Sequence, residues 1–258
     1  MSDYKTEVII LRSWKSREYD RIYSVFSREH GKMRVVGIGT RRPKAKLASG
    51  LEPFTRSDVF LVKCRYLDRV KGTIVLRQYV DFKKNLDYLI EGQRTVNVLE
   101  KLLPDAEANE VVFVAMKNYL KMLNSISKKD ERIKNIVEER DNKRIISQLA
   151  QLSLIWKVIY HSGYFPRFYN CTYCNKKIAE RDKYIFILSQ GISCGCQIKH
   201  NHNLQFTLNK NVIKLIRFLV TQDILLVKKL KIKIEILQDL KKFTRLILEQ
   251  ITEKKIIL

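Results

Sequence analysis

The sequence predicts an α+β multidomain protein in which an N-terminal five-stranded OB-like β-barrel is followed by an all-α helical domain that carries a small four-cysteine module. Three observations predict it. The first 80 residues form short strand-like stretches, the apolar period changes from two to about 3.6 after Asp81, and four of the five cysteines fall within residues 171–196. We divide the chain into a barrel at 1–80, a first helical part at 81–170, the cysteine module at 171–203 and a C-terminal helical part at 204–258.

The barrel is predicted from five stretches rich in β-branched and aromatic residues, separated by polar or glycine-bearing turns. Five strands at this spacing fit a Greek-key barrel of the OB type, which commonly binds oligonucleotides on one face. The predicted strands are residues 7–11, 21–26, 32–36, 58–62 and 72–76.

Apolar residues at helical spacing predict the helices. Pro104 ends the first of them, and Thr207 is the expected cap of the fourth. Residues 128–144 are mostly charged and are expected to form a solvated helix or loop. Residues 229–236 alternate like a strand inside a helical region, so their structure stays open. The helices are marked by Leu86, Leu89, Ile90, Val96, Leu99, Leu102 and Leu103; by Val112, Met116, Tyr119, Leu120 and Leu123; by Ile145, Leu149, Leu152, Trp156 and Ile159; by Leu208, Val212, Leu215, Ile216 and Leu219; and by Leu240, Thr244, Ile247 and Ile251.

The chain is strongly basic. Its 258 residues carry 50 Lys and Arg against 27 Asp and Glu, for a net charge of +23. A charge excess of this size is better tolerated when a polyanion is the partner, and nucleic acid is the usual one. An acidic membrane surface is the alternative, but we find no basic amphipathic helix with aromatic anchors. No apolar run could span a bilayer, and residues 1–6 lack the features of a signal peptide, so we expect a cytoplasmic protein without a membrane partner.

The cysteines predict a metal site. Cys171 and Cys174 form a Cys-x-x-Cys pair, and Cys194 and Cys196 form a second, tighter pair. Two such pairs can hold one tetrahedral Zn²⁺, which makes 171–203 a zinc-binding module. Free thiols or a redox pair are the alternatives, and His200 or His202 could replace one thiolate. We expect Cys64 to be a core thiol in the fourth strand.

The expected role of zinc is structural. The insert 175–193 has few apolar residues, so metal binding should supply most of its folding free energy. The His-x-Glu of zinc deaminases is absent, as are His-Glu-x-x-His, the phosphate-binding glycine loops and Gly-x-Ser-x-Gly. We therefore expect no enzyme.

A basic loop between the third and fourth strands is the expected nucleic-acid contact. Four cations in six residues, with a proline that limits flexibility, can follow a phosphate backbone; a solvated cluster is the alternative. Tyr4, Trp14, Tyr19 and Tyr66 are candidates to stack on bases or to fill the core, and Arg28 adds charge nearby. The predicted DNA-binding residues are Arg12, Lys15, Arg17, Arg34, Arg41, Arg42, Lys44 and Lys46.

The order of these parts resembles the RecO family of bacterial recombination mediators. The residues that carry the resemblance are Gly31 and Lys32 at the third strand, residues 39–44 in the basic loop, Leu51-Glu52-Pro53-Phe54 before the fourth strand, and the Cys171 to Cys196 region. The tight second cysteine pair departs from the Cys-x-x-Cys that zinc-binding members usually show.

This resemblance implies a DNA repair and recombination protein that binds single- and double-stranded DNA and anneals complementary strands. It implies work with RecR and with the acidic tail of single-stranded DNA-binding protein to load the recombinase RecA, in the bacterial cytoplasm at the nucleoid. It implies no catalysis. An RNA-binding or ribosome-associated OB protein with a zinc ribbon is the alternative, and a zinc-dependent nucleic-acid-modifying enzyme is a more distant one.

Overall fold

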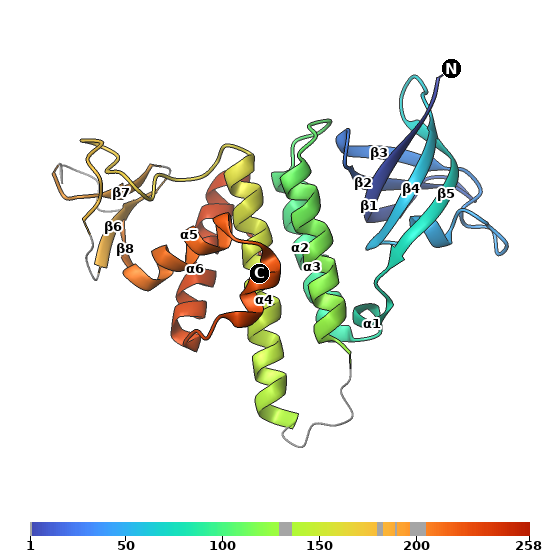
Figure 1. Cartoon of the computed structure of the whole chain (residues 1–258). Coiled ribbons are helices and arrows are strands. Elements are labelled where there is room, and N and C mark those ends of the chain that lie inside the picture. Colours follow the sequence, from blue (N-terminus) through green and yellow to red (C-terminus); the bar gives the residue numbers. More distant parts are fainter. Residues whose placement is uncertain (1, 129–135, 180–182, 189, 197–204) are drawn as a thin grey trace. The chain divides into compact units, whose positions relative to one another are not determined.

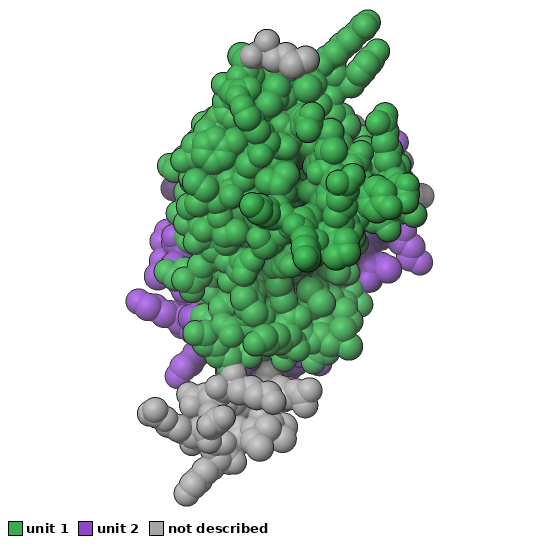
Figure 2. Space-filling model, turned by 90° about the vertical axis from the view of Figure 1, so that its right-hand side faces the viewer, with its two compact units in different colours: residues 1–132 green, residues 133–258 purple. Residues whose placement is uncertain are grey.

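The structure is a computed structural model that describes residues 2–128, 136–179, 183–188, 190–196 and 205–258. Its elements are shown in Figure 1. The chain divides into two compact units, residues 1–132 and 133–258, which Figure 2 shows in green and purple. Among the described residues, none of the helices is long and apolar enough to cross a membrane.

The first unit begins with a closed barrel, which confirms the predicted five strands. The strand order is β1-β2-β3-β5-β4, with β3 and β5 paired in parallel and the other neighbours antiparallel. Alternate side chains such as Val8, Ile10 and Val25 fill the interior, as period-two strands require. The strands are β1 (Asp3–Lys15), β2 (Arg21–Ser27), β3 (Gly31–Gly37), β4 (Thr55–Val62) and β5 (Asp68–Gln78), and a 3-10 helix, η1 (Ser49–Leu51), precedes β4.

Three helices complete this unit, namely α1 (Val80–Lys83), α2 (Leu86–Leu102) and α3 (Glu110–Ile126). The side chain of Asn109 caps α3 by accepting a hydrogen bond from the backbone N–H of Val112. The second helix ends two residues before Pro104, as predicted. Phe26 of β2 stacks on Phe113 of α3 with ring centroids 6.3 Å apart, so the outer side of β2 packs against α3 at this point.

Gly31 and Lys32 join the barrel to these helices. Gly31 has φ +69°, and a Cβ added there would lie 2.1 Å from the backbone oxygen of Glu107, so only glycine fits. The Lys32 Nζ donates to the carbonyl oxygens of Glu100 and Leu103, at 2.9 and 2.6 Å, at the end of α2. A cation at this helix end satisfies carbonyls that have no partner within the helix.

The second unit combines helices with a small sheet. Its helices are α4 (Ile136–His161), α5 (Lys210–Thr221) and α6 (Ile234–Thr252), with a 3-10 helix η3 (Ile224–Lys229). Its sheet has the order β7-β6-β8 and is made of β6 (Lys183–Ile187), β7 (Gly191–Ser193) and β8 (Gln205–Asn209). The helical C-terminal region that the sequence predicts is therefore confirmed.

An aromatic cluster forms the core of this unit. Trp156 of α4 is fully buried and donates its indole N–H to Thr244 Oγ1 at 2.9 Å. Phe186 of β6 is also fully buried, with its ring centroid 4.8 Å from that of Phe243 on α6. The insert between the cysteine pairs thus shares a core with the helices, so its folding draws on apolar contacts outside the insert as well as on any bound metal.

Two local predictions need correction, and one segment whose structure the sequence leaves open can now be described. Thr207 and Leu208 belong to β8, and α5 begins at Lys210 because the side chain of Asn209 caps it. Cys64 follows the end of β4 and is only half-buried, so it lies in a loop and not in a core strand. The alternation at 229–236 is not a strand: η3 ends at Lys229, and α6 begins at Ile234.

Two segments rich in charged residues complete the comparison with the sequence. Within 229–236, the connection between η3 and α6 is extended, with Leu230 and Ile232 half-buried, which explains the alternating pattern. Of the charged stretch 128–144, residues 129–135 lie outside the described residues, and α4 begins at Ile136.

Candidate nucleic-acid interface and metal centre

The outer face of β1, β2 and β3 carries a cross-strand row of polar residues. Arg12 pairs in register with Ser24, and Ser24 pairs with Arg34. The register of β1 shifts between Ile10 and Arg12, so Ile10 enters the core while Arg12 points outward. Both arginines are exposed, and together they place two cations on one open face of the barrel.

Two loops extend this face. The backbone N–H of Arg41 donates to the carbonyl of Tyr19 at 3.0 Å, and the Arg41 guanidinium donates to the carbonyl of Glu18 at 2.6 Å. The backbone N–H of Gly39 donates to Asp20 Oδ1 at 2.8 Å. These bonds tie the basic loop 38–48 to the β1–β2 loop 16–20, so the cations of both loops are brought together.

We use the term cationic face for the eight predicted DNA-binding residues together. All eight are exposed. Within the described part of the chain, no carboxylate lies within ion-pair distance of any of them. Unpaired, solvated cations attract phosphates without first breaking an ion pair. The cationic face consists of Arg12, Lys15, Arg17, Arg34, Arg41, Arg42, Lys44 and Lys46.

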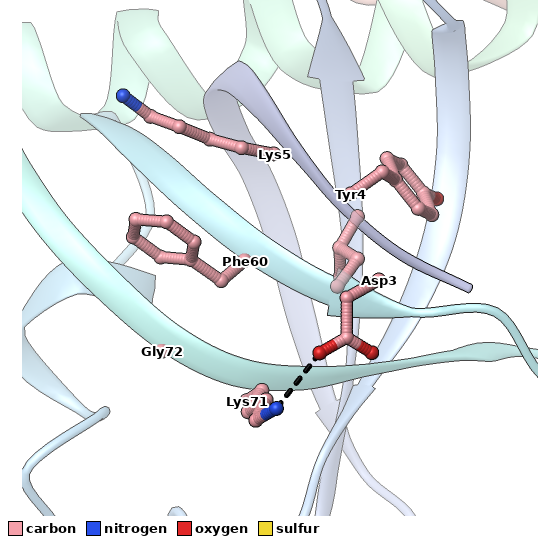
Figure 3. Close-up of a pocket in the computed structure, with 7 residues that line it drawn as sticks. Asp3, Tyr4, Lys5, Phe60, Lys71 and Gly72 are labelled. Atoms are coloured by element: carbon pink, nitrogen blue, oxygen red, sulfur yellow. Dashed lines mark hydrogen bonds and ion pairs between the residues drawn. The ribbon is translucent and has the colours of Figure 1, made fainter. Parts of the chain in front are cut away.

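The outer face of β1, β4 and β5 differs in that two of its exposed lysines are paired with carboxylates. Lys5 lies 2.6 Å from Asp58, and Lys71 lies 2.7 Å from Asp3. Figure 3 shows the shallow pocket on this face, with Phe60 between Lys5 and Lys71 and the ion pair of Lys71 dashed. Lys5 and Lys71 are therefore already bound by carboxylates, whereas no described carboxylate pairs with a residue of the cationic face.

Arg28 does not belong to the cationic face. Its guanidinium donates to both carboxylate oxygens of Glu110 at 2.7 Å and lies 3.4 Å from Glu7. This bidentate pair joins β2 to α3, so Arg28 stabilises the unit and is not available as free charge. The sequence could not show this, because Glu110 lies 82 residues away.

The aromatic candidates separate into two kinds. Tyr4 packs against the core, its hydroxyl donates to Asp68, and its ring meets His30 edge-on. Burial, with the hydrogen bond to Asp68, raises the pKa of Tyr4. Trp14, Tyr19 and Tyr66 are 38%, 44% and 84% exposed. Three of the four rings are therefore open to a ligand, and Tyr4 has the alternative role in the core.

Sequence reasoning missed the cations around Tyr66. Lys63 and Arg65 lie in the loop between β4 and β5, and Arg69 lies near the start of β5, opposite Val36 of β3. All three are exposed. The loops after the first and fourth strands of an OB barrel are its usual ligand-binding loops, so the position of these residues between the fourth and fifth predicted strands could have identified them.

The four cysteines of the module converge on one point. Their Sγ atoms all lie within 4.8 Å of one another, with Cys171 to Cys196 at 3.7 Å and Cys174 to Cys194 at 3.6 Å. A Zn–S bond of about 2.3 Å in a tetrahedron requires sulfur atoms about 3.8 Å apart. The arrangement therefore fits a metal ion with four thiolate ligands. His200 and His202 lie outside the described residues.

The local backbone explains how the tight second pair contributes both sulfurs. Gly195 has φ +86°, a left-handed conformation that turns the chain within one residue between Cys194 and Cys196. Burial opposes ionisation of Cys171, but hydrogen bonds from the backbone N–H groups of Cys174, Cys194 and Tyr173 lower the pKa of Cys171 to about 6. The hydrogen bond with Cys194 is the main reason that the pKa of Cys196 is raised to about 12. Four thiolates this close repel one another, and a cation relieves that repulsion.

Comparison with known proteins agrees with this architecture. The family model for the N-terminal part of recombination protein O matches residues 1–79, and the model for its C-terminal part matches residues 146–256. A protein named DNA repair protein RecO from Dehalococcoides mccartyi is 26% identical over 254 residues, covering 98% of this chain and 92% of the relative. Proteins of the same name from Desulforamulus reducens and Thermodesulfovibrio yellowstonii are 23% and 25% identical, covering 99% and 93% of this chain and 92% and 90% of those relatives.

Proposed function

Because this chain belongs to the RecO family, we propose that it is a DNA repair and recombination mediator that binds single- and double-stranded DNA and anneals complementary strands. The observation that carries this proposal is the cationic face, eight exposed cations without a carboxylate partner in the described part of the chain. Two strands repel each other through their phosphates. A protein that neutralises phosphates on both strands lowers that barrier without reading sequence.

The proposal includes partners. The family resemblance implies RecR, single-stranded DNA-binding protein and, indirectly, RecA, in the bacterial cytoplasm at the nucleoid. Residues 81–258 hold 32 basic and 19 acidic residues, and this excess favours the acidic tail of single-stranded DNA-binding protein as their ligand. The role is one of binding, with no catalytic residue assigned.

Strand annealing tests this proposal directly. Complementary strands, each coated with single-stranded DNA-binding protein, are mixed with and without the full chain, and duplex formation is followed by energy transfer between end labels. We expect faster annealing that weakens as salt is raised, because phosphate contacts release counterions. RNA strands run in parallel separate this function from RNA binding: tighter binding to RNA, with no acceleration of DNA annealing, would contradict the proposal.

The metal that we propose for the four cysteines is a structural Zn²⁺ held by Cys171, Cys174, Cys194 and Cys196. The sulfur spacing supports it, and four protein ligands leave no open position for an activated water. Elemental analysis should find one zinc per chain in the purified protein, and Cys171→Ser with Cys174→Ser should abolish it. Zinc that survives this double substitution would contradict the ligand set. Zinc retained in Cys196→Ser, but lost when His200 or His202 is also replaced, would move one ligand to a histidine.

A further inference from the structure

Three exposed aromatic rings of the barrel share one feature: an arginine guanidinium lies over each ring. A guanidinium and a nucleobase are both flat and both stack on aromatic faces. Each of these exposed rings therefore has a group that also binds phosphate over one of its faces. The pairs are Arg34 over Trp14 at 5.7 Å from the ring centroid, Arg42 over Tyr19 at 5.2 Å and Arg65 over Tyr66 at 5.4 Å.

The Trp14 pair lies within the strand register of the cationic face. Trp14 is two residues from Arg12 on β1, so both side chains point to the same, outer side of the sheet. Arg34 lies across β2 from Arg12, in the row that contains Ser24. One aromatic ring and two cations thus meet on an area a few residues wide, which is the size of one nucleotide.

Ser24 adds a second, independent observation. Its neighbours Tyr23 and Val25 belong to the barrel core, so the Ser24 side chain points to the outer face, between Arg12 and Arg34. Ser24 is only 1% exposed, and its Oγ has no hydrogen-bond partner among the residues that the structure describes. A buried hydroxyl without a partner costs folding free energy, and a ligand oxygen placed between the two arginines would satisfy it.

We propose that Trp14, Ser24 and Arg34, together with Arg12, form a subsite for one unpaired nucleotide of single-stranded DNA. In the free protein the Arg34 guanidinium occupies the stacking position on Trp14. When a strand binds, the base takes that position, Arg34 and Arg12 contact the phosphate, and the Ser24 hydroxyl donates to a ligand oxygen. A base inside a duplex has both faces covered by its neighbours, so the subsite selects unpaired bases. This inference rests on the proposed DNA binding.

Phe60 on the opposite face supplies the contrast and the control. It is 36% exposed, close to the value for Trp14, and Lys5 Nζ lies 5.8 Å from its ring centroid. Lys5 is held by Asp58, and the nearby Lys71 by Asp3, as Figure 3 shows for the second pair. Those cations are already paired with carboxylates and gain little from a phosphate. A base that displaced Lys5 from the Phe60 ring would therefore not be stabilised by a new contact between Lys5 and phosphate.

The test uses the full chain with a labelled thymidine oligonucleotide and an abasic oligonucleotide of equal length, which has the phosphates without the bases. Affinities are measured by fluorescence anisotropy. We expect Trp14→Ala to weaken binding of the thymidine strand at least about fivefold while leaving the abasic strand unchanged. Phe60→Ala should change neither. Equal effects of Trp14→Ala and Phe60→Ala on the thymidine strand would overturn the proposal.

Tryptophan fluorescence reports the same event at one residue. Trp156 is fully buried in the second unit, so quenching by the thymidine strand should come from Trp14. Trp14→Phe keeps a ring for stacking, and it should retain affinity and lose the quenching. Unchanged Trp14 fluorescence at saturating thymidine strand would also overturn the subsite.

Two further variants separate the roles of the neighbours. Arg34→Ala should flatten the salt dependence by about 0.7 in log-log slope for both strands, without reducing the preference for the thymidine strand over the abasic one. Ser24→Ala removes an unpaired buried hydroxyl, so it should raise thermal stability while weakening binding of the thymidine strand about two- to tenfold. If neither strand binds with salt-dependent affinity, the proposed function fails. If both bind equally well and Trp14→Ala is neutral, the subsite alone fails.

Discussion

Replacing Lys44 and Lys46 with alanine tests whether the basic loop contacts phosphate. Both lysines are exposed, and none of the carboxylates that the structure describes pairs with them. Arg41 is better left in place because its guanidinium holds the β1–β2 loop. Each phosphate contact on a single strand contributes about 0.7 to the slope of log affinity against log salt concentration. If about half of the eight cations of the cationic face contact phosphate, the wild-type slope is about −2.8.

The variant should lose two contacts and therefore about 1.4 of that slope. Between 50 and 200 mM salt, the affinity ratio of wild type to variant should then fall about sevenfold. Titrations of a labelled single strand at several salt concentrations, followed by anisotropy, measure it. Unfolding curves for both proteins should coincide, because exposed lysines contribute little to stability.

Lys5→Ala with Lys71→Ala is the matched control. It removes the same charge from the same barrel, on the face where both lysines are paired with aspartates. The slope of this control should equal that of the wild type within about 0.3. If the two double variants lose the same slope, affinity follows net charge, and the assignment of the cationic face is wrong. A wild-type slope shallower than about −2 would also exclude an extended phosphate-binding surface.

Three predictions concern stability. Gly31→Ala should lower the free energy of unfolding by at least about 2 kcal/mol, because its Cβ would meet Glu107; Gly163→Ala, with φ +78° and open space, should cost about 1 kcal/mol, and equal losses would rule out the steric argument. Burial lowers the pKa of Lys157 below its usual 10.5, so in this pH range the folded state binds fewer protons at Lys157 than the unfolded state does. The stability of the wild type relative to Lys157→Met should therefore rise with pH between the lowered pKa and 10.5. A pH-independent difference in alkaline urea titrations would contradict this. Phe186→Ala should lower the free energy of unfolding by about 3 to 5 kcal/mol. A chelator should leave the protection of β6 from hydrogen exchange largely intact. Loss of that protection on chelation would show that folding of the insert depends on the metal.

Local pattern was enough to predict the barrel and the helices. Strands of a small barrel alternate between core and solvent, and helices repeat every 3.6 residues, so both are visible in short windows. The errors occurred where a contact distant in sequence decides the outcome. Arg28 looked like free charge because Glu110 is 82 residues away. The insert 175–193 looked too poor in apolar residues to form a core, because Phe243, the core partner of its Phe186, lies on the last helix.

Ion pairing of the lysines is a second feature that the sequence could not predict. Composition places more positive charge per residue in the first 80 residues, yet it cannot say which cations are free. Lys5 and Lys71 are as basic in sequence as Lys44 and Lys46, and only the strand register brings Asp58 and Asp3 beside the first two. The cationic face is therefore defined by cations that form no ion pair with the described carboxylates, and ion pairing is a property of the folded sheet.

The tight cysteine pair shows how one backbone angle can bring four cysteine sulfurs together. In an extended strand, two cysteines with one residue between them point to the same side of the chain. Their sulfur atoms would then stand too far apart to bind one tetrahedral metal ion together. Gly195 resolves this with φ +86°, which folds the chain so that Cys194 and Cys196 approach Cys174 and Cys171 at 3.6 and 3.7 Å. An L-residue at that position would be strained. The glycine inside the pair thus compensates for the departure from Cys-x-x-Cys, because it brings all four sulfurs within 4.8 Å of one another.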